Sequence, residues 1–372
     1  MKFVKVCHIT TVHSRNDTRI FIKECSSLAS AGYDVALVVA DGFGDETRKD
    51  VKIVDVGKIA GRVKRILFSR FLAYRKGVEL DADIYHLHDP ELIPAGVALK
   101  RRGKRVIFDS HEDIPKQILG KHYLHPAARG ALSRLYGLYE SRACRIFDGV
   151  IAATPFIRDK FLPINSMTVD VNNYPLQGEL VSDIPGKKSG GNEICYVGSI
   201  SAIRGIREIV KSLEIAGDVR LNLAGNFVDA GLEEEVRGYP GWAKVNYIGY
   251  AGRDDVRRIL SSSRAGLVTL HSAVNYLDSL PVKMFEYMSA SLPVIASNFP
   301  LWREIVEGNR CGLCVDPCSP EAIAAAIRRL LSDGGEAPEM GRNGREAIEK
   351  KYNWGAEEEK LLSIYSGILA DS

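Results

Sequence analysis

The feature that most constrains the fold is a repeated alternation of short apolar strands with helical segments. Residues 4–10 (VKVCHIT) and 34–41 (DVALVVAD) predict strands, and residues 18–32 between them carry apolar side chains at helical spacing. Further strands are predicted at 84–89, 104–111 and 149–154. Because helical segments separate successive strands, the pattern predicts a parallel sheet with helices on its faces.

The same alternation restarts after a polar segment at 166–190, which is rich in Asn, Gly, Pro and Ser. Strands are then predicted at 193–199, 219–226, 245–250, 265–270, 292–297 and 312–316. A chain of 372 residues also exceeds the size at which one core keeps growing. We therefore predict an α/β chain of two Rossmann-like, doubly wound parallel-sheet domains that face each other across a cleft.

The predicted boundaries follow from this rhythm. Residues 1–165 form the N-terminal domain, 166–190 the linker and 191–352 the C-terminal domain. Residues 353–372 form an amphipathic C-terminal helix that we expect to pack back on the N-terminal domain.

Composition narrows the setting in which the chain works. No stretch approaches the roughly 18 uninterrupted apolar residues of a membrane span, and the first residues are too polar for a signal peptide. An odd number of cysteines, seven, fits a reducing compartment, so we expect a cytoplasmic protein. Cys311, Cys314 and Cys318 lack a fourth ligand at zinc-finger spacing, so no metal is expected there.

Charge is distributed unevenly between the two halves. Residues 1–165 hold 28 Lys and Arg against 19 Asp and Glu, whereas the remainder holds 22 against 28. The basic first half predicts an anionic partner, but the acidic second half and the lack of a recognisable module argue against nucleic acid. Residues 62–76 contain six cations, no acid and apolar residues at helical spacing. They predict either a helix lying on anionic lipid or an ordinary surface helix.

Ligands of open parallel sheets bind beyond the carboxyl ends of the strands, and here those positions are polar. No G-x-G-x-x-G follows the first strand, and neither a G-x-x-x-x-G-K-[ST] loop nor a G-x-S-x-G elbow occurs. These absences argue against a nicotinamide dehydrogenase, a P-loop phosphotransferase and an α/β-hydrolase. Two facing nucleotide-type domains suit a nucleotide-linked substrate and a second reactant.

Several ordered motifs carry a resemblance to a known family. The stretches YVGSISAIRGIREIV (196–210) and LPVKMFEYMSASLPVIASNFPLWREIVEGNRCGLCVDP (280–317) resemble the donor half of the family-four retaining glycosyltransferases, which have the GT-B fold. NDTRIFIKE (16–24), HLHDPELIP (86–94) and FDSHEDIP (108–115) resemble a bacterial branch that builds surface polysaccharides. The resemblance spans nearly the whole chain.

The family carries two glutamates with seven residues between them, and this chain has Asp278 and Glu286 at those places. The resemblance implies that the first acid holds donor-sugar hydroxyls and the second the ribose hydroxyls. Ser279 is a plausible helix cap before Pro281, so that free N–H groups between Leu280 and Lys283 face the phosphates. Aspartate at 278 shortens the reach by about 1.5 Å, which makes this the position where donor identity is expected to be set.

The resemblance also implies two cations that hold the diphosphate. Ser199 replaces the first, and Arg204 stands in the place of the second, where its planar guanidinium can grip phosphate bidentately. Lys283 is a further source of positive charge. The predicted donor-binding residues are Gly198, Ser199, Arg204, Asn226, Tyr250, Asp278, Ser279, Leu280, Lys283 and Glu286, with the base read around 247–252.

In the first domain, His111 stands where the family places a histidine close to the donor sugar, although a histidine that caps its own loop is the alternative. The predicted catalytic residues are therefore His111, Arg204 and Asp278. The predicted acceptor side comprises Asp17, Arg19, His88, Asp89 and Glu91. Glu304 matches a glutamate after the donor loop of the family, or is a glutamate on a helix surface.

The expected activity is transfer of a hexosyl group, with retention, from a nucleoside diphosphate sugar, UDP-sugar favoured over GDP-sugar, to a lipid-linked or saccharide acceptor. The leaving phosphate takes the acceptor's proton, and neither a cofactor nor a metal is expected. A polyprenyl-diphosphate acceptor would bring the basic half to the inner face of the membrane. Two alternatives stay open: a nucleotide-sugar epimerase of the same fold and a catalytically silent subunit of polysaccharide assembly.

Overall fold

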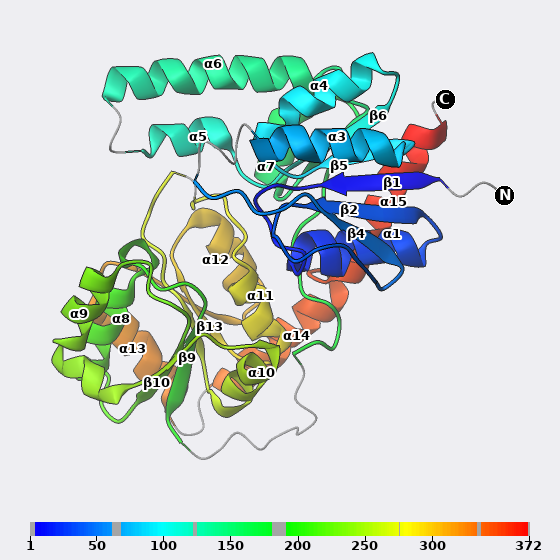
Figure 1. Ribbon diagram of the computed structural model, residues 1–372. Helices are drawn as coiled ribbons and strands as arrows, with labels where there is room; N and C mark the ends of the chain where they lie inside the picture. Colours follow the sequence, from blue (N-terminus) through cyan, green and yellow to red (C-terminus); the bar gives the residue numbers. More distant parts are fainter. Residues whose placement is uncertain are drawn as a thin grey trace. The chain divides into compact units, whose positions relative to one another are not determined.

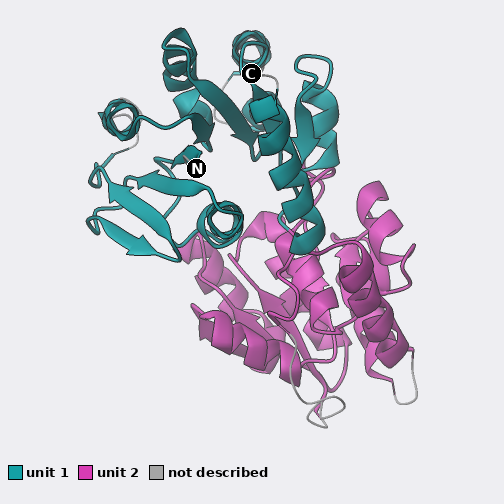
Figure 2. Ribbon diagram, turned by 90° about the vertical axis from the view of Figure 1, so that its right-hand side faces the viewer, with its two compact units in different colours: residues 1–173, 354–372 teal, residues 174–353 magenta. Residues whose placement is uncertain are grey.

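The computed structural model describes residues 4–61, 68–121, 125–180, 191–274, 276–332 and 336–370. The chain divides into two compact units, which Figure 2 distinguishes by colour. Unit 1 comprises Met1–Asn173 and Trp354–Ser372, and unit 2 comprises Tyr174–Asn353. Each unit is built around one sheet.

The sheet of unit 1 has the strand order β3-β4-β2-β1-β5-β6-β7-β8 (Figure 1). All neighbouring strands are parallel except β3, which is antiparallel to β4. The strands are β1 (Lys5–Ile9), β2 (Asp34–Val39), β3 (Glu46–Arg48), β4 (Val51–Asp55), β5 (Ile84–Leu87), β6 (Arg105–Ser110), β7 (Gly149–Ala152) and β8 (Thr168–Asp170). The register of β1 and β5 places His8 directly opposite His86.

Helices connect these strands, and one helix from the C-terminal end of the chain, α15, also belongs to this unit. They are η1 (Thr18–Cys25), α1 (Ser26–Ser30), α3 (Arg70–Leu80), η3 (Pro90–Leu92), α4 (Ile93–Arg101), α5 (Ile114–Leu119), α6 (Pro126–Cys144), α7 (Pro155–Phe161) and α15 (Trp354–Ala370). The segment η1 is a π-helix, and Asp17 caps it by accepting from the backbone N–H groups of Arg19 and Ile20. This wider turn directs Arg19 and Glu24 into the interior, where both are buried.

The sheet of unit 2 is wholly parallel, with the order β11-β10-β9-β12-β13-β14. Its strands are β9 (Glu193–Val197), β10 (Arg220–Ala224), β11 (Val245–Gly249), β12 (Gly266–Val268), β13 (Val294–Ser297) and β14 (Gly312–Val315). Its helices are η4 (Ala202–Arg204), α8 (Ile206–Ile215), α9 (Ala230–Arg237), η5 (Pro240–Lys244), α10 (Arg253–Ser262), α11 (Val282–Ser289), α12 (Pro300–Val306), α13 (Pro320–Leu331) and α14 (Ala337–Lys350).

Both faces of the unit 2 sheet are covered by apolar packing. Alternate residues of β9 point to opposite faces, so Cys195 joins one core cluster while Ile194 and Tyr196 join the other. Doubly covered parallel sheets bury their strands completely, and this accounts for the uninterrupted apolar runs in the sequence.

All the strands named from the sequence are present, and the doubly wound α/β fold is confirmed. Two segments differ from expectation. The pair β3 and β4 was not predicted, and β8 lies inside the segment predicted to be a linker, because Thr168–Asp170 pairs with β7 and extends the sheet. The units divide at 173/174 rather than at 165. Residues 181–190 of the predicted linker lie outside the described residues.

The C-terminal helix α15 belongs to unit 1. Trp354 donates from Nε1 to Ser27 Oγ at 3.0 Å, and the backbone N–H of Asn172 donates to Glu357 Oε2 at 2.7 Å. Both partners are buried, so the helix is anchored to the first unit by polar contacts as well as by apolar packing.

Among the described residues, no helix is both long enough and apolar enough to cross a bilayer. Residues 62–67 of the basic segment predicted at 62–76 lie outside the described part of the chain. The remainder leads into α3, and both Phe68, just before this helix, and Phe71, within it, are exposed.

Candidate functional site

The carboxyl ends of β9 and β10 in unit 2 form two glycine turns that press against each other. Gly198 follows β9 with φ of 123°, and Gly225 follows β10 with φ of 138°. A Cβ atom on Gly225 would lie 1.9 Å from the carbonyl oxygen of Gly198, so only glycine fits. The sheet end is therefore bare backbone, which lets a ligand approach closely.

Lys283, in the first turn of α11, extends beneath the Gly198 turn. Its Nζ is sealed from solvent and has no hydrogen-bond partner among the described residues. The Nζ lies 3.6 Å from the centre of the Tyr196 ring, and a Cβ on Gly198 would lie 3.2 Å from it. Burial, followed by the positive charge of Arg204, lowers the pKa of Lys283 to about 7. An unpaired buried ammonium is costly and calls for an anion.

Arg204 ends the short helix η4 on the same side of the sheet. Its Nη1 lies 3.4 Å from the carbonyl oxygen of Ser199, and its charge acts on Lys283. The next residue, Gly205, has φ of 77°, and a Cβ there would lie 2.2 Å from the carbonyl oxygen of Thr269. The predicted set of Gly198, Ser199, Arg204 and Lys283 is thus brought together, and two cations are available to one anionic ligand.

Glu286 lies on α11 but is already paired. Its Oε1 accepts from Arg253 Nη1 at 2.6 Å, and Arg253 Nη2 lies 2.6 Å from Glu179 Oε1. Sequence reasoning did not name Arg253 as a site residue, although it begins α10 after the short loop that follows β11, and ligands of such sheets bind beyond the strand ends. A ribose that binds Glu286 must share it with this guanidinium.

The predicted cap at Ser279 is wrong. Its Oγ donates to the carbonyl oxygen of Tyr276 at 2.8 Å, and its own carbonyl accepts from Trp302 Nε1 at 2.7 Å. Pro281, with ψ of 121°, is the residue that precedes α11, so the helix begins two residues later than a cap at Ser279 would place it. Ser279 instead fixes the turn that carries Asp278, which is half-buried.

Four other residues of unit 2 that the sequence analysis named are less closely tied to the candidate site. The backbone carbonyl of Asn226 accepts from Ile200 N at 3.0 Å, and Leu280 packs against the core. Tyr250 is 80% exposed, which leaves its ring free to meet a ligand. Glu304 is exposed on α12, as a glutamate on a helix surface would be.

In unit 1, the predicted residues gather around Asp109, which the sequence reasoning did not single out. Arg19 donates to both carboxylate oxygens of Asp109, at 2.9 and 2.8 Å. His88 Nδ1 and His111 Nε2 lie 3.2 and 2.9 Å from Asp109 Oδ2. Burial alone would raise the pKa of Asp109, but the charges of Arg19 and His111 and these hydrogen bonds hold it well below its usual range.

Burial separates the predicted acceptor residues into two groups. Arg19, His88 and Asp89 are buried, so they hold the site from beneath and do not offer a surface to a substrate. Asp89 accepts from the backbone N–H of Thr11 at 2.5 Å, and Glu91 Oε1 accepts from the Thr11 hydroxyl at 2.6 Å. This set ties the loop after β1 to the loop after β5.

Three of the predicted residues, Asp17, Glu91 and His111, are partly exposed on unit 1, together with a histidine that was missed. The side chains of Asp17 and His111 are 27% and 19% exposed, and that of His13 is 30% exposed. His13 Nδ1 lies 3.1 Å from Asp17 Oδ2. Burial lowers the pKa of His13, but this contact and the charges of nearby aspartates raise it overall. His13 follows the first strand, and that position was its signal in the sequence.

Comparison with known proteins identifies the class. The model described as Glycosyltransferase Family 4 matches residues 18–166, and the model described as Glycosyl transferases group 1 matches residues 179–347. The two models together span most of both units. The chain belongs to the family-four glycosyltransferases and has their GT-B fold.

Sequence identity to curated relatives is 34% over a short segment and lower over longer ones. A GDP-mannose-dependent alpha-(1-6)-phosphatidylinositol monomannoside mannosyltransferase of Mycobacterium tuberculosis is 34% identical over 24% of this chain and 24% of its own. A phosphatidyl-myo-inositol mannosyltransferase of Mycobacterium leprae is 22% identical over 83% of this chain and 80% of its own. The chain spans only about a quarter to a third of the length of the first curated relatives that it matches.

Solved structures share the fold. Sucrose-phosphate synthase of Thermosynechococcus elongatus superimposes with a TM-score of 0.80 at 18% identity, covering 99% of this chain and 100% of its own. HepE of Anabaena, in complex with UDP and glucose, gives a TM-score of 0.74 at 11% identity, covering 98% of this chain and 100% of its own.

Proposed function

We propose that this protein is a retaining hexosyltransferase that uses a nucleoside diphosphate sugar as donor. The observation that carries the proposal is the unpaired, buried ammonium of Lys283 beneath the glycine turns of β9 and β10, with Arg204 beside it. Such a site is suited to the charge that develops on a departing diphosphate, since preorganised cations stabilise a transition state without reorganising.

The roles of the side chains follow from their chemistry. Arg204 and Lys283 hold the diphosphate, Asp278 holds hydroxyls of the donor sugar, and Glu286 shares the ribose with Arg253. The leaving phosphate takes the proton of the acceptor hydroxyl as the bond to the sugar breaks on the same face. His111 is the group of unit 1 that assists transfer.

We propose that no divalent metal ion takes part at the diphosphate, because two side-chain cations supply the positive charge there. Addition of Mg²⁺ or Mn²⁺ to the assay is then expected to leave the rate unchanged. A rate that depends on either ion would overturn this assignment.

The donor that we favour is a UDP-sugar over a GDP-sugar. The solved structure of HepE contains UDP, which supports this choice, whereas one curated relative is described as GDP-mannose-dependent. A thermal-shift panel of UDP, GDP and ADP separates the bases, because only a ligand that binds the native state raises the melting temperature. UDP is expected to give the largest shift, and a larger shift with GDP would contradict the choice.

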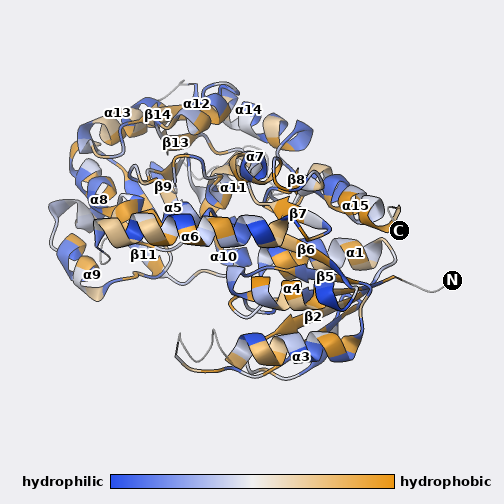
Figure 3. Ribbon diagram, turned by 90° about the horizontal axis from the view of Figure 1, so that it is seen from above, coloured by the Kyte–Doolittle hydropathy of each residue, from blue (hydrophilic) through white to orange (hydrophobic). Residues whose placement is uncertain are grey.

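The acceptor that we propose is a polyprenyl-diphosphate-linked sugar or another saccharide of cell-surface polysaccharide synthesis, reached at the cytoplasmic face of the membrane. The support is an apolar stripe on α6 that faces away from its contact with α5. Figure 3 shows hydrophobic and hydrophilic residues along the length of α6. Its exposed apolar residues are Leu132, Leu135, Leu138 and Tyr139, and Ile146 follows the helix.

Cations accompany this stripe. Arg134, Arg142 and Arg145 are exposed on the same segment, and its one acid, Glu140, is buried against Lys160 Nζ at 2.7 Å. An apolar face flanked by arginines complements an anionic lipid surface. We therefore propose that the surface 132–146 contacts anionic lipid, which the sequence analysis considered for residues 62–76.

Transfer itself is tested by proton NMR of the donor with and without a membrane-lipid acceptor extract. The proposal predicts consumption of donor only with the extract, and an anomeric coupling in the product that matches the donor. Conversion of the donor sugar without an acceptor would favour an epimerase. Inverted configuration would overturn retention.

A further inference from the structure

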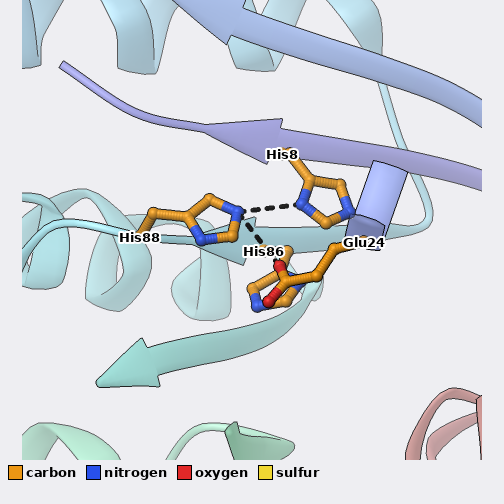
Figure 4. A group of neighbouring side chains, drawn as sticks. All are labelled: His8, Glu24, His86 and His88. Carbon is orange, nitrogen blue, oxygen red and sulfur yellow. Dashed lines mark hydrogen bonds and ion pairs between the residues drawn. The ribbon is translucent and has the colours of Figure 1, made fainter. Parts of the chain in front are cut away.

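Four ionisable side chains meet in the interior of unit 1, next to Asp109. They are His8 on β1, Glu24 on η1, His86 on β5 and His88 directly after β5 (Figure 4). All four are buried, with at most 1% exposure. One potential ligand atom of each lies within 4.8 Å of the others. Three imidazoles and a carboxylate are an unusual content for a protein core.

The outer nitrogen of each imidazole is held by a group outside the cluster. His88 Nδ1 lies 3.2 Å from Asp109 Oδ2. His86 Nδ1 and His8 Nε2 lie 2.9 and 3.3 Å from the hydroxyl oxygen of Tyr365. Metal-binding histidines almost always have such a partner on the second nitrogen, which fixes the ring and its tautomer.

Two of the four groups, His86 and Glu24, lack hydrogen-bond partners on the side that faces the cluster, in the part of the chain that the structure describes. His86 Nε2 and both carboxylate oxygens of Glu24 accept no hydrogen bond within the described residues. Glu24 Oε1 lies 3.1 Å from Arg19 Nε, but that nitrogen already donates to Asp109. His88 Nε2 lies 2.8 Å from His8 Nδ1 and 3.9 Å from Glu24 Oε2, the two contacts drawn in Figure 4. Buried acceptors without donors are costly unless a cation satisfies them.

We propose that His8, Glu24, His86 and His88 bind one divalent transition-metal ion of the zinc class. Three imidazole nitrogens and one carboxylate oxygen are ligands that Zn²⁺ accepts in tetrahedral geometry. At metal–nitrogen distances of about 2.0–2.1 Å, the His8–His88 contact opens to about 3.3 Å, which needs only a small rotation of the rings.

Four protein ligands complete a tetrahedral shell, so the ion is structural and leaves no open position for a substrate. It cross-links β1, η1 and β5 and fixes His88, which in turn positions Asp109 and His111. A metal here departs from the expectation of a metal-free protein, which considered only the spacing of the cysteines. It does not depend on the proposed function or on the absence of a metal at the diphosphate.

The test is the metal content of the protein, produced without an affinity tag in zinc-supplemented medium. The metal is measured by inductively coupled plasma mass spectrometry. We expect about one zinc per chain, released when the protein unfolds. Glu24→Gln and His86→Gln are expected to lose the ion and to lower the melting temperature. His125→Gln, a change of an exposed histidine in the same unit, is expected to keep both.

Cobalt gives a second readout that does not require a folded variant. Wild-type protein produced with Co²⁺ is expected to show the intense visible absorption of a tetrahedral site. Wild-type protein with no stoichiometric zinc and no such absorption would overturn the proposal. The four residues would then share protons, with His8 bonded to His88 and Glu24 protonated.

Discussion

At the scale of the residue, Lys283 shows how binding chemistry and stability oppose each other. Its ammonium is buried without a hydrogen-bond partner among the described residues, and it lies over the face of the Tyr196 ring and close to the turn at Gly198. Neither contact replaces the solvation that the charge has lost. The free protein is therefore destabilised at the position where we propose that the diphosphate binds.

Replacement of this lysine should separate the two effects. Lys283→Met keeps the length of the side chain and removes the charge, so at pH 6 it is expected to stabilise the free protein by about 1–3 kcal/mol. The same change should weaken UDP binding by about 10- to 100-fold, since hydrogen bonds to charged groups contribute about 1.5–3 kcal/mol. Thermal unfolding and calorimetry measure the two quantities.

The matched control is Lys350→Met, which removes a lysine whose side chain is 72% exposed in the same unit. It should change neither the melting temperature nor the affinity appreciably. Unchanged affinity in Lys283→Met would remove this lysine from the diphosphate site.

The lowered pKa of Lys283 makes binding depend on pH. With a pKa of about 7 in the free protein, this lysine is mostly neutral at pH 8.5 and charged at pH 6. A bound diphosphate favours the charged form, so UDP binding at pH 8.5 should take up a proton, whereas binding at pH 6 should not. Calorimetry in buffers of different ionisation enthalpy counts the protons, and Lys283→Met should abolish the uptake.

Lys283 also makes the free energy of unfolding depend on pH. Its pKa is about 7 in the folded state against an ordinary value of 10.5, so between these pH values the unfolded chain binds more protons. Its contribution to stability is fully present above 10.5 and is lost as the pH falls through about 7.

At the scale of the element, the two glycine turns after β9 and β10 define the end of the unit 2 sheet. Gly225→Ala would place a Cβ 1.9 Å from the Gly198 carbonyl oxygen at a φ of 138°. We expect a loss of at least about 3 kcal/mol in the free energy of unfolding, because the backbone of the two strands must separate.

Gly217→Ala is the control for the backbone angle alone. Gly217 has φ of 84°, with no atom within 4 Å of an added Cβ. It should cost about 1–2 kcal/mol, the usual penalty of a left-handed conformation. Equal losses in the two variants, measured by denaturant unfolding, would show that the turns do not constrain each other.

The helices and strands could be predicted from the sequence where the pattern of apolar residues indicates their type and position. Buried parallel strands such as β9 and β13 read as continuous apolar runs and were found. The short β8 was missed, because three residues of a strand at the edge of a sheet carry little periodicity and this one lies in a polar segment. The start of α11 was misplaced because Ser279 and Pro281 resemble a cap and a first turn, whereas the Ser279 hydroxyl bonds backward to Tyr276.

Motif spacing in the sequence singled out Arg204, Lys283 and His111, and the structure brings Arg204 and Lys283 to the same end of the unit 2 sheet. Sequence reasoning could not tell that Arg19, His88 and Asp89 are buried, because burial depends on which strands become neighbours. The pairing of His8 with His86 is a matter of register between β1 and β5, two strands far apart in the chain. Glu24 is directed inward by a π-helix that no local pattern indicated.

At the scale of the whole molecule, the chain joins distant segments within unit 1. The helix α15 returns to the first sheet, and its Tyr365 hydroxyl contacts both His8 and His86. The polar interior of unit 1 is thus completed by the last element of the chain. A fragment that stops before Trp354 lacks this closure.

The surface of unit 1 carries the prediction about the membrane. Leu135 is 65% exposed, so Leu135→Glu leaves the core intact and adds repulsion from anionic lipid. We expect binding to vesicles that contain phosphatidylglycerol to weaken by at least about tenfold, as measured by co-sedimentation. Leu162→Glu, at another exposed leucine of unit 1, should bind as the wild type does. Equal binding of both variants would exclude α6 as the contact.

In the proposed function, Arg204 and Lys283 hold the departing diphosphate during glycosyl transfer. The most direct test of this role is the rate of nucleoside diphosphate release from the donor in the presence of acceptor extract, for wild type, Arg204→Ala and the control Arg207→Ala. Arg207 lies on α8 and pairs with Glu235, so its loss should leave the rate close to that of the wild type. Arg204→Ala should be about 100- to 1,000-fold slower. Turnover of Arg204→Ala within about threefold of wild type would contradict the account.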